Sequence, residues 1–156
     1  MNGTDEPCFV DTNVWLYALV ESGDSSKTFV ARDLLLNQAR PILTSTQVIN
    51  EVCVNLIRKA GIGEQVVREM TTAFFRRYEV LLTTEALLLE VSRLRERFSF
   101  SYWDSLIVAA GLQGNATTLF SEDMQDGLVV EDRLTISNPF IQPSAGDGPS
   151  KTVRQR

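Results

Sequence analysis

The chain has 156 residues, of which 44% are hydrophobic and 22% are charged. That size and composition are typical of one soluble globular domain and exclude a disordered chain. Its 15 Lys and Arg residues against 20 Asp and Glu residues give a net charge of −5, and it contains no histidine. The missing histidine excludes Ser–His and Cys–His hydrolases and metal sites built on imidazole, so acid–base or metal chemistry must depend on carboxylates.

Short apolar runs alternate along the chain with longer segments of helical periodicity, which is typical of an α/β domain with a parallel sheet. The pattern predicts five strands, at residues 7–10, 41–43, 79–82, 117–120 and 134–136. It predicts six helices, at residues 12–20, 25–39, 44–60, 63–76, 84–98 and 101–111. Thr44 and Gln47 have the spacing of a capping box at the start of the third helix, which we expect to end before Gly61.

One domain is expected over residues 1–141, and a disordered basic tail over residues 142–156, where apolar periodicity is lost. Cys8 and Cys53 stand singly in apolar segments and are expected to be buried, reduced thiols. The first seven residues are polar, unlike a signal peptide, and no apolar run approaches the roughly 20 residues of a membrane span. We therefore expect a soluble cytoplasmic protein.

Carboxylates follow two of the predicted strands, at the carboxyl ends where α/β sheets bind ligands. Asp11 comes directly after the first strand, and serves there either as a helix N-cap or as a functional group. The segment 121–127 follows the fourth strand and contains Glu122, Asp123 and Asp126. Such an acidic run is usually a polar turn, but its place at a strand end makes it a candidate site.

Two further carboxylates lie on predicted helices. Glu51 belongs to a narrow polar stripe with apolar residues on both sides, so it is either a solvated or a partly buried carboxylate. Asp104 follows Ser101 with the spacing of a capping box, and the helix dipole favours an aspartate there. The rest of that helix is small and apolar, which predicts that it is packed on most sides and that Asp104 faces the sheet edge.

Together, Asp11, Glu51, Asp104 and Asp123 come from separate elements. Grouping these anions is unfavourable unless a cation binds among them. Oxygen ligands suit a hard ion such as Mg²⁺ or Mn²⁺, which activates water and neutralises charge on a phosphodiester. The pattern therefore favours a metal-dependent nuclease.

Four short segments, 9–13, 49–52, 102–105 and 119–124, resemble the motifs of PIN-domain proteins, above all the ribonuclease toxins of VapBC-type toxin–antitoxin modules. The resemblance extends from Cys8 to about Phe140. It implies a three-layer α/β/α fold around a mostly parallel sheet of about five strands. It also implies a Mg²⁺- or Mn²⁺-dependent endoribonuclease, with a small antitoxin in the acidic groove, often contributing an arginine, and a homodimer.

The acidic quartet of that family corresponds to Asp11, Glu51, Asp104 and Asp123, and we expect Asp11, Asp104 and Asp123 to bind the metal. Glu51 is expected either to bind the metal or to position the attacking water. The resemblance also assigns supporting roles to Asn13 and Ser121, and Asp126 is the alternative to Asp123.

The alternative class is a binding module, either a non-catalytic PIN scaffold or a receiver-like domain. A receiver needs a lysine after its last strand, and Lys27, Lys59 and Lys151 are not suitably placed. A haloacid-dehalogenase-type phosphatase is disfavoured because Asn13 replaces its second aspartate. The acidic charge is unusual for an RNA-binding protein. Five arginines on predicted helices or directly after one either flank the groove or lie on solvated faces, namely Arg76, Arg77, Arg93, Arg95 and Arg97.

Overall fold

The structure is a computed structural model that describes residues 5–21 and 23–141. Its helices are α1 (Thr12–Leu19), α2 (Ser25–Asn37), α3 (Thr46–Ala60), α4 (Glu64–Arg77), α5 (Glu85–Arg97) and α6 (Tyr102–Gln113). Its strands are β1 (Cys8–Val10), β2 (Ile42–Ser45), β3 (Glu79–Leu81), β4 (Thr118–Phe120), β5 (Val129–Val130) and β6 (Leu134–Ser137).

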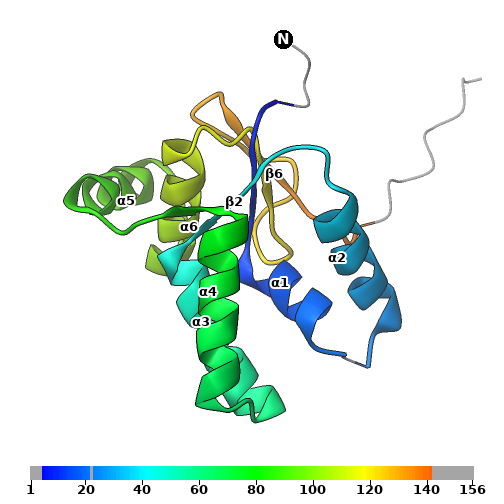
Figure 1. Cartoon of the computed structure of the whole chain (residues 1–156). Coiled ribbons are helices and arrows are strands. Elements are labelled where there is room, and N and C mark those ends of the chain that lie inside the picture. Colours follow the sequence, from blue (N-terminus) through cyan, green and yellow to red (C-terminus); the bar gives the residue numbers. More distant parts are fainter. Residues whose placement is uncertain (1–4, 22, 142–156) are drawn as a thin grey trace, which may run out of the picture.

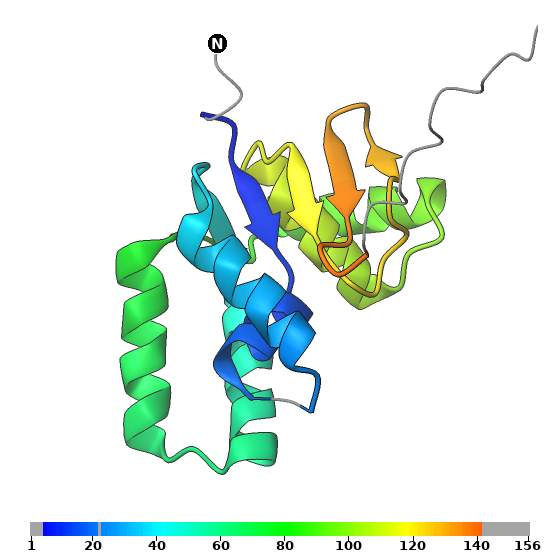
Figure 2. The same ribbon diagram turned by 90° about the vertical axis from the view of Figure 1, so that its right-hand side faces the viewer.

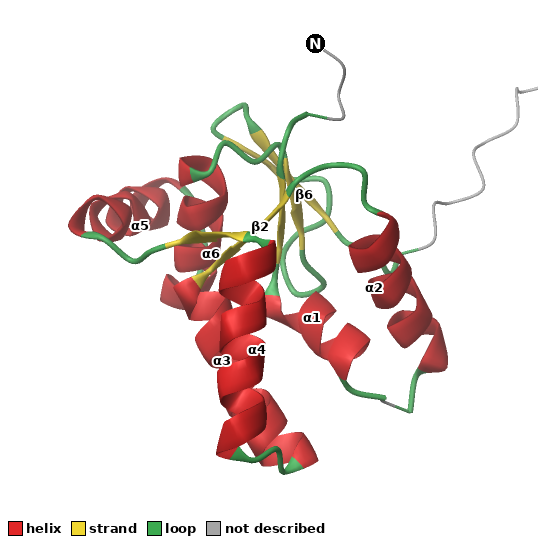
Figure 3. Cartoon of the chain, viewed as in Figure 1, coloured by secondary structure: helices red, strands yellow, loops and turns green. Residues whose placement is uncertain are grey.

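The strands form one sheet in the order β3-β2-β1-β4-β6-β5. All neighbours pair in parallel except β5 and β6, which are antiparallel. The sheet lies at the centre, with α5 and α6 on one side and α1 and α2 on the other (Figures 1 and 3). The helices α3 and α4 extend as a pair from one end of the sheet (Figure 2). This arrangement confirms the predicted α/β fold with a mostly parallel sheet.

The predicted strands and helices are all present, with three differences in detail. The sheet contains a sixth strand, β5, which was not predicted because two residues are too short for a periodic pattern. Helix α2 ends at Asn37, before the predicted end at Ala39. The N-cap of α3 is Ser45, whose Oγ accepts a hydrogen bond from the Val48 amide, and not Thr44. Thr44 instead pairs with Val80 in the sheet, so it cannot begin the helix.

Packing in the core fixes the places of two helices, α1 and α6. Helix α1 directly follows β1, and α6 begins beside the carboxyl ends of β1 and β4. The buried Trp15 of α1 donates a hydrogen bond to the Val10 carbonyl and packs edge-on against Phe74 and Tyr78, with ring centroids 5.0 and 5.1 Å apart. Residues 105–112 of α6 are all buried, as the small apolar sequence predicts. At its end, Gly114 lets the helix approach β2, because a Cβ there would lie 2.4 Å from Leu43 Cδ1.

Cys8 and Cys53 are buried free thiols, as predicted. Within the described residues, no helix has both the length and the apolar character needed to cross a membrane. The predicted basic tail at 142–156 lies outside the described residues.

Candidate active site

A cleft of about 480 Å³ lies where β1 and β4 end, between α1, α3 and α6. Its walls include the four carboxylates that the sequence singled out, Asp11, Glu51, Asp104 and Asp123. Strands β1 and β4 are parallel neighbours, so the residues that follow them meet at one edge of the sheet. The fold therefore brings together four residues that are far apart in the sequence.

Asp11 lies at the bottom of the cleft and is only 7% exposed. One carboxylate oxygen accepts the Thr12 amide at 2.7 Å, as an N-cap, and the other accepts the Ser121 hydroxyl at 2.9 Å. Burial raises the pKa of Asp11 to about 6, against these two hydrogen bonds, and the negative charges of Glu51 and Asp104 add to the shift. Asp11 is thus both a helix cap and a buried acid that faces other acids.

Glu51 is held from two sides on the wall formed by α3. The Thr12 hydroxyl donates to its Oε2 at 2.5 Å, and the Gln47 amide donates to its Oε1 at 2.9 Å. The next residue of the polar stripe, Asn55, donates to the Glu51 carbonyl at 2.8 Å. Glu51 is partly buried, which favours the second of the two interpretations of the stripe.

Asp104 lies in the first turn of α6. The predicted capping contact is present, since the Ser101 hydroxyl accepts the Asp104 amide at 3.1 Å. Burial raises the pKa of the Asp104 carboxyl, the Ser101 contact opposes this, and the charges of Asp123 and Glu51 raise it further. Asp104 therefore faces the other carboxylates as well as occupying a favourable helix position.

The loop after β4 presents its three carboxylates differently. Asp123 lines the cleft and accepts the Asn13 amide at 3.0 Å. Glu122 forms an ion pair with Lys27 at 2.8 Å and accepts the Tyr17 hydroxyl at 2.9 Å. Asp126 accepts a backbone amide, that of Asn138, at 2.7 Å and is not among the cleft residues.

The hydrogen-bond donors to Asp11, Glu51 and Asp123 are neutral groups, whereas Glu122, which also lines the cleft, is paired with Lys27. No three acidic, histidine or cysteine side chains among the described residues are close enough together to hold a metal ion. The groups that could bind a metal ion here are carboxylate and hydroxyl oxygens, which suit Mg²⁺ or Mn²⁺ chemically. Burial is the main cause of the raised pKa values of Asp11 and Asp104, and the neighbouring carboxylates add to both shifts.

Several residues of this cleft were not predicted as site residues, and three of them bear on function: Thr12, Lys59 and Trp103. Thr12 follows Asp11 directly, and Trp103 precedes Asp104, so proximity to a predicted site residue was the available signal. Lys59 lies two turns after Glu51 on the same face of α3, at positions separated by eight residues. It is the only basic side chain among the described cleft residues, because none of the five predicted arginines lines the cleft.

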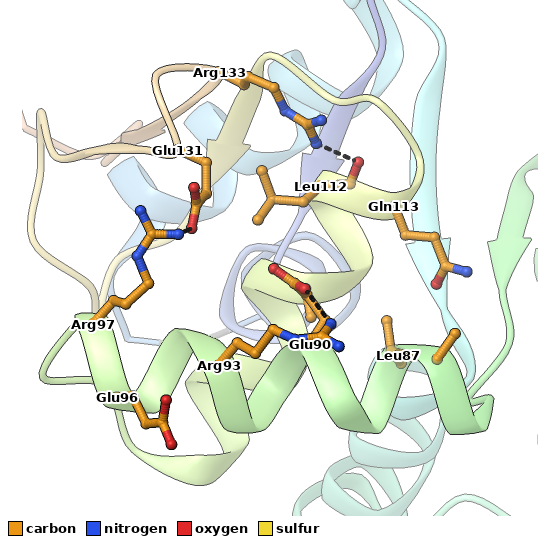
Figure 4. A pocket seen from close by; sticks show the side chains of 11 residues that line it. Leu87, Glu90, Arg93, Glu96, Arg97, Leu112, Gln113, Glu131 and Arg133 are labelled. Atoms are coloured by element: carbon orange, nitrogen blue, oxygen red, sulfur yellow. Dashed lines mark hydrogen bonds and ion pairs between the residues drawn. The ribbon is translucent and has the colours of Figure 1, made fainter.

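A second cavity, of about 630 Å³, lies between α5, the end of α6 and the β5–β6 turn (Figure 4). Four of its six charged residues form two ion pairs. Arg97 contacts Glu131 at 2.6 Å, and Arg93 contacts Glu90 at 3.2 Å. Arg133 donates to the Leu112 carbonyl at 3.0 Å, at the end of α6.

The PIN domain family model matches residues 8–125. No curated protein sequence matches the chain.

Several solved structures share the fold. Mycobacterium tuberculosis VapC20, described as a Sarcin-Ricin loop cleaving toxin, has a TM-score of 0.61 at 22% identity, over 74% of this chain and 91% of that one. A toxin–antitoxin complex from Klebsiella pneumoniae has a TM-score of 0.63 at 14% identity, over 85% and 98%. VapBC2 from Rickettsia felis, bound to a promoter DNA fragment, has a TM-score of 0.53 at 19% identity, over 75% and 88%.

Proposed function

This chain belongs to the PIN-domain family, and on that premise we propose that it is a divalent-metal-dependent endoribonuclease that acts as the toxin of a toxin–antitoxin pair. The observation that carries the proposal is the cleft lined by Asp11, Glu51, Asp104 and Asp123 from four separate elements. The similar structures support it, since one of them is a toxin that cleaves the Sarcin-Ricin loop and another is a toxin–antitoxin complex.

In this proposal Asp11, Asp104 and Asp123 bind Mg²⁺ or Mn²⁺. The bound cation would supply Lewis-acid activation of water and positive charge against the phosphodiester. The oxygen-only donor set and the grouping of four carboxylates in the cleft support a cation, and the absence of histidine leaves carboxylates as the available general bases.

Three other residues have positioning roles in the proposal. Glu51, held by Thr12 and Gln47, orients the attacking water at a fixed place on the α3 wall. Ser121 fixes the orientation of Asp11 through its hydroxyl, and Asn13 fixes that of Asp123 through its amide. Attack by water on the phosphorus with departure of the 3′ oxygen leaves a 3′-hydroxyl and a 5′-phosphate.

The test is cleavage of RNA by the purified chain with Mg²⁺ or Mn²⁺ and with EDTA. We expect cleavage only with the metal, and a loss of cleavage in Asp11→Asn and Asp104→Asn. Asn can accept the Thr12 amide as Asp11 does, so the first variant keeps the helix cap. If both variants cleave as fast as wild type, the assigned site is wrong.

A matched pair of variants tests the fourth carboxylate. We expect Asp123→Asn to reduce cleavage and Asp126→Asn to leave it unchanged, because Asp123 lines the cleft and Asp126 accepts only a backbone amide on the far part of the loop. The opposite result would make Asp126 the site residue. Failure of wild type to bind a divalent cation by calorimetry would favour the scaffold alternative.

The antitoxin partner has support from an apolar groove of about 360 Å³ between α1, α2 and α4, lined by Trp15, Leu19, Leu36 and Phe74. Leu19 and Leu36 are 47% and 82% exposed, and α1 also lines the acidic cleft. We expect an apolar antitoxin segment in the groove and a basic side chain in the cleft. Leu36→Glu should then weaken co-purification with an antitoxin without changing cleavage by the free chain.

The homodimer has support from exposed apolar side chains on α3 and α5, which are Val54, Ile57, Leu88 and Leu89. Light scattering of the purified chain should give twice its 17.5 kDa mass. A monomeric mass would reject the dimer and leave the nuclease proposal intact.

A further inference from the structure

Two exposed aromatic residues stand next to Asp104 at the start of α6. Tyr102 is 42% exposed and Trp103 is 59% exposed, and their rings meet edge-on with centroids 5.9 Å apart. Exposing so large an apolar ring to water is unfavourable, and the six residues from 106 to 111 of the same helix are buried. A pair of exposed rings beside a catalytic carboxylate is therefore a candidate contact surface for a ligand.

The two rings differ in what already covers them. The Arg95 guanidinium lies 5.7 Å from the centre of the Tyr102 ring, and Tyr102 is not among the cleft residues. Trp103 lines the cleft together with Asp104 and Ile107, and among the described residues no cation covers its ring. Trp103 therefore offers the cleft an open aromatic face.

Helix α3 brings complementary chemistry to the same cleft. Lys59 projects from α3 and is the one basic side chain among the described cleft residues. An RNA strand presents phosphates to cations and base faces to aromatic rings, and stacking on a tryptophan requires a base that is not already stacked in a duplex. A cleft lined by a lysine, several carboxylates and an exposed indole offers contacts for both parts of an RNA strand.

We propose that Trp103 stacks on a nucleobase beside the scissile phosphate and so positions the RNA strand in the cleft. This inference rests on the proposed function, since it names a binding residue of the same site. Trp103 contacts the substrate, and no chemical step is assigned to it.

The chain contains two tryptophans, and their different exposure to solvent allows their fluorescence to be distinguished. Trp15 is 4% exposed and bonded to Val10, whereas Trp103 is 59% exposed. The test uses Asp11→Asn protein in EDTA, so that RNA is bound but not cut, and a single-stranded oligoribonucleotide. We expect RNA to quench the exposed tryptophan and to protect it from acrylamide, a signal that Trp103→Phe removes.

Cleavage by the chain with Asp11 intact gives the second readout. Trp103→Ala should lower kcat/KM on single-stranded RNA by about 10-fold, mainly through KM, and Trp103→Phe should restore most of it. Tyr102→Ala is the matched control, because Tyr102 is the neighbouring exposed ring outside the cleft, and it should cleave as wild type does. An RNA that lacks the base expected to face Trp103 should lower the kcat/KM of wild type by the same factor. It should not lower the kcat/KM of Trp103→Ala any further.

The failures are distinguishable. If wild type cleaves RNA but Trp103→Ala behaves like Tyr102→Ala, or if bound RNA leaves the exposed tryptophan unquenched, the stacking inference is wrong and the nuclease proposal stands. If Trp103→Ala loses antitoxin binding and keeps wild-type cleavage, the ring is a protein contact and the inference is again wrong. If wild type neither binds nor cleaves RNA, both proposals fail together.

Discussion

The acidic cleft and the cavity beside α5 are both lined by charged side chains, but the two sites differ in the partners of their carboxylates. In the larger cavity, Arg97 contacts Glu131 and Arg93 contacts Glu90, so four of the six charged side chains that line it form ion pairs within the protein (Figure 4). In the smaller cleft, Asp11 and Glu51 are bonded to Ser121, Thr12 and Gln47, which are all neutral.

The difference shows that neither size nor charge content identifies a site by itself. Paired charges satisfy one another and need nothing from solution, so the cavity beside α5 has the character of a structural contact between α5 and the β5–β6 turn. Carboxylates that face one another and have only neutral partners leave charge for a ligand to neutralise. The following predictions test this contrast, in order of expected effect.

Glu51→Gln should lower kcat/KM for RNA cleavage by about 100-fold, on the scale of removing one preorganised electrostatic group. The side chain keeps its length and its carbonyl oxygen can still accept the Thr12 hydroxyl, so the loss is one of charge rather than of packing. Glu90→Gln removes a paired glutamate from the other cavity and should leave the rate unchanged. Equal effects of the two variants would remove the distinction between the cavities.

The stability of the metal-free chain should fall as the pH rises from 4 to 6. Burial and neighbouring charge raise the pKa of Asp11 to about 6, so over this range the folded state binds more protons than the unfolded state. Ionisation of Asp11 should lower the free energy of unfolding by at most about 3 kcal/mol, and Mg²⁺ should restore this lost stability at pH 7. Asp11→Asn should flatten the dependence in urea titrations at pH 5 and 7, and an unchanged slope would mean that Asp11 is ionised freely.

Lys59→Ala should raise KM several-fold at low salt and reduce the salt dependence of RNA binding by about one counterion. Arg58→Ala is its control, since Arg58 is the preceding residue, exposed and outside the cleft. The measurement is RNA affinity by anisotropy over a series of KCl concentrations. A larger salt effect for Arg58→Ala would move the RNA path off the cleft.

The Arg97–Glu131 pair should contribute at most about 1 kcal/mol to the free energy of unfolding in a double-mutant cycle, because Arg97 is 62% exposed and solvent screens the pair. Cleavage should not change in either single variant. A cleavage defect there would give this cavity a role in RNA binding that its paired charges do not indicate.

Most of the fold could be predicted from the sequence because each strand and helix carries its own periodicity and its own stop signals. Gly61, for example, takes a left-handed conformation (φ 59°) and ends α3 where expected. The errors arose where tertiary contacts decide. Thr44 was expected to cap α3 but is drawn into the sheet, and the two-residue strand β5 exists only through its pairing with β6.

The candidate site could be predicted in part for a different reason. The carboxylates stand at strand ends or in polar stripes, which local patterns reveal, and the structure brings all four to one cleft. Local patterns do not show which side of a helix faces that cleft, so Lys59 and Trp103 were not predicted as site residues. For the same reason, the sequence left open whether the arginines of α4 and α5 flank the groove or lie on solvated faces. The catalytic roles themselves remain predictions.

The contacts that build the cleft join distant parts of the chain. Ser121 meets Asp11, and Asn13 meets Asp123, each across 110 residues, through the pairing of β1 with β4 at the middle of the sheet. A growing polypeptide shorter than about 120 residues carries none of these contacts, however many of its helices have formed. The proposed site is therefore complete only when nearly the whole domain has been synthesised.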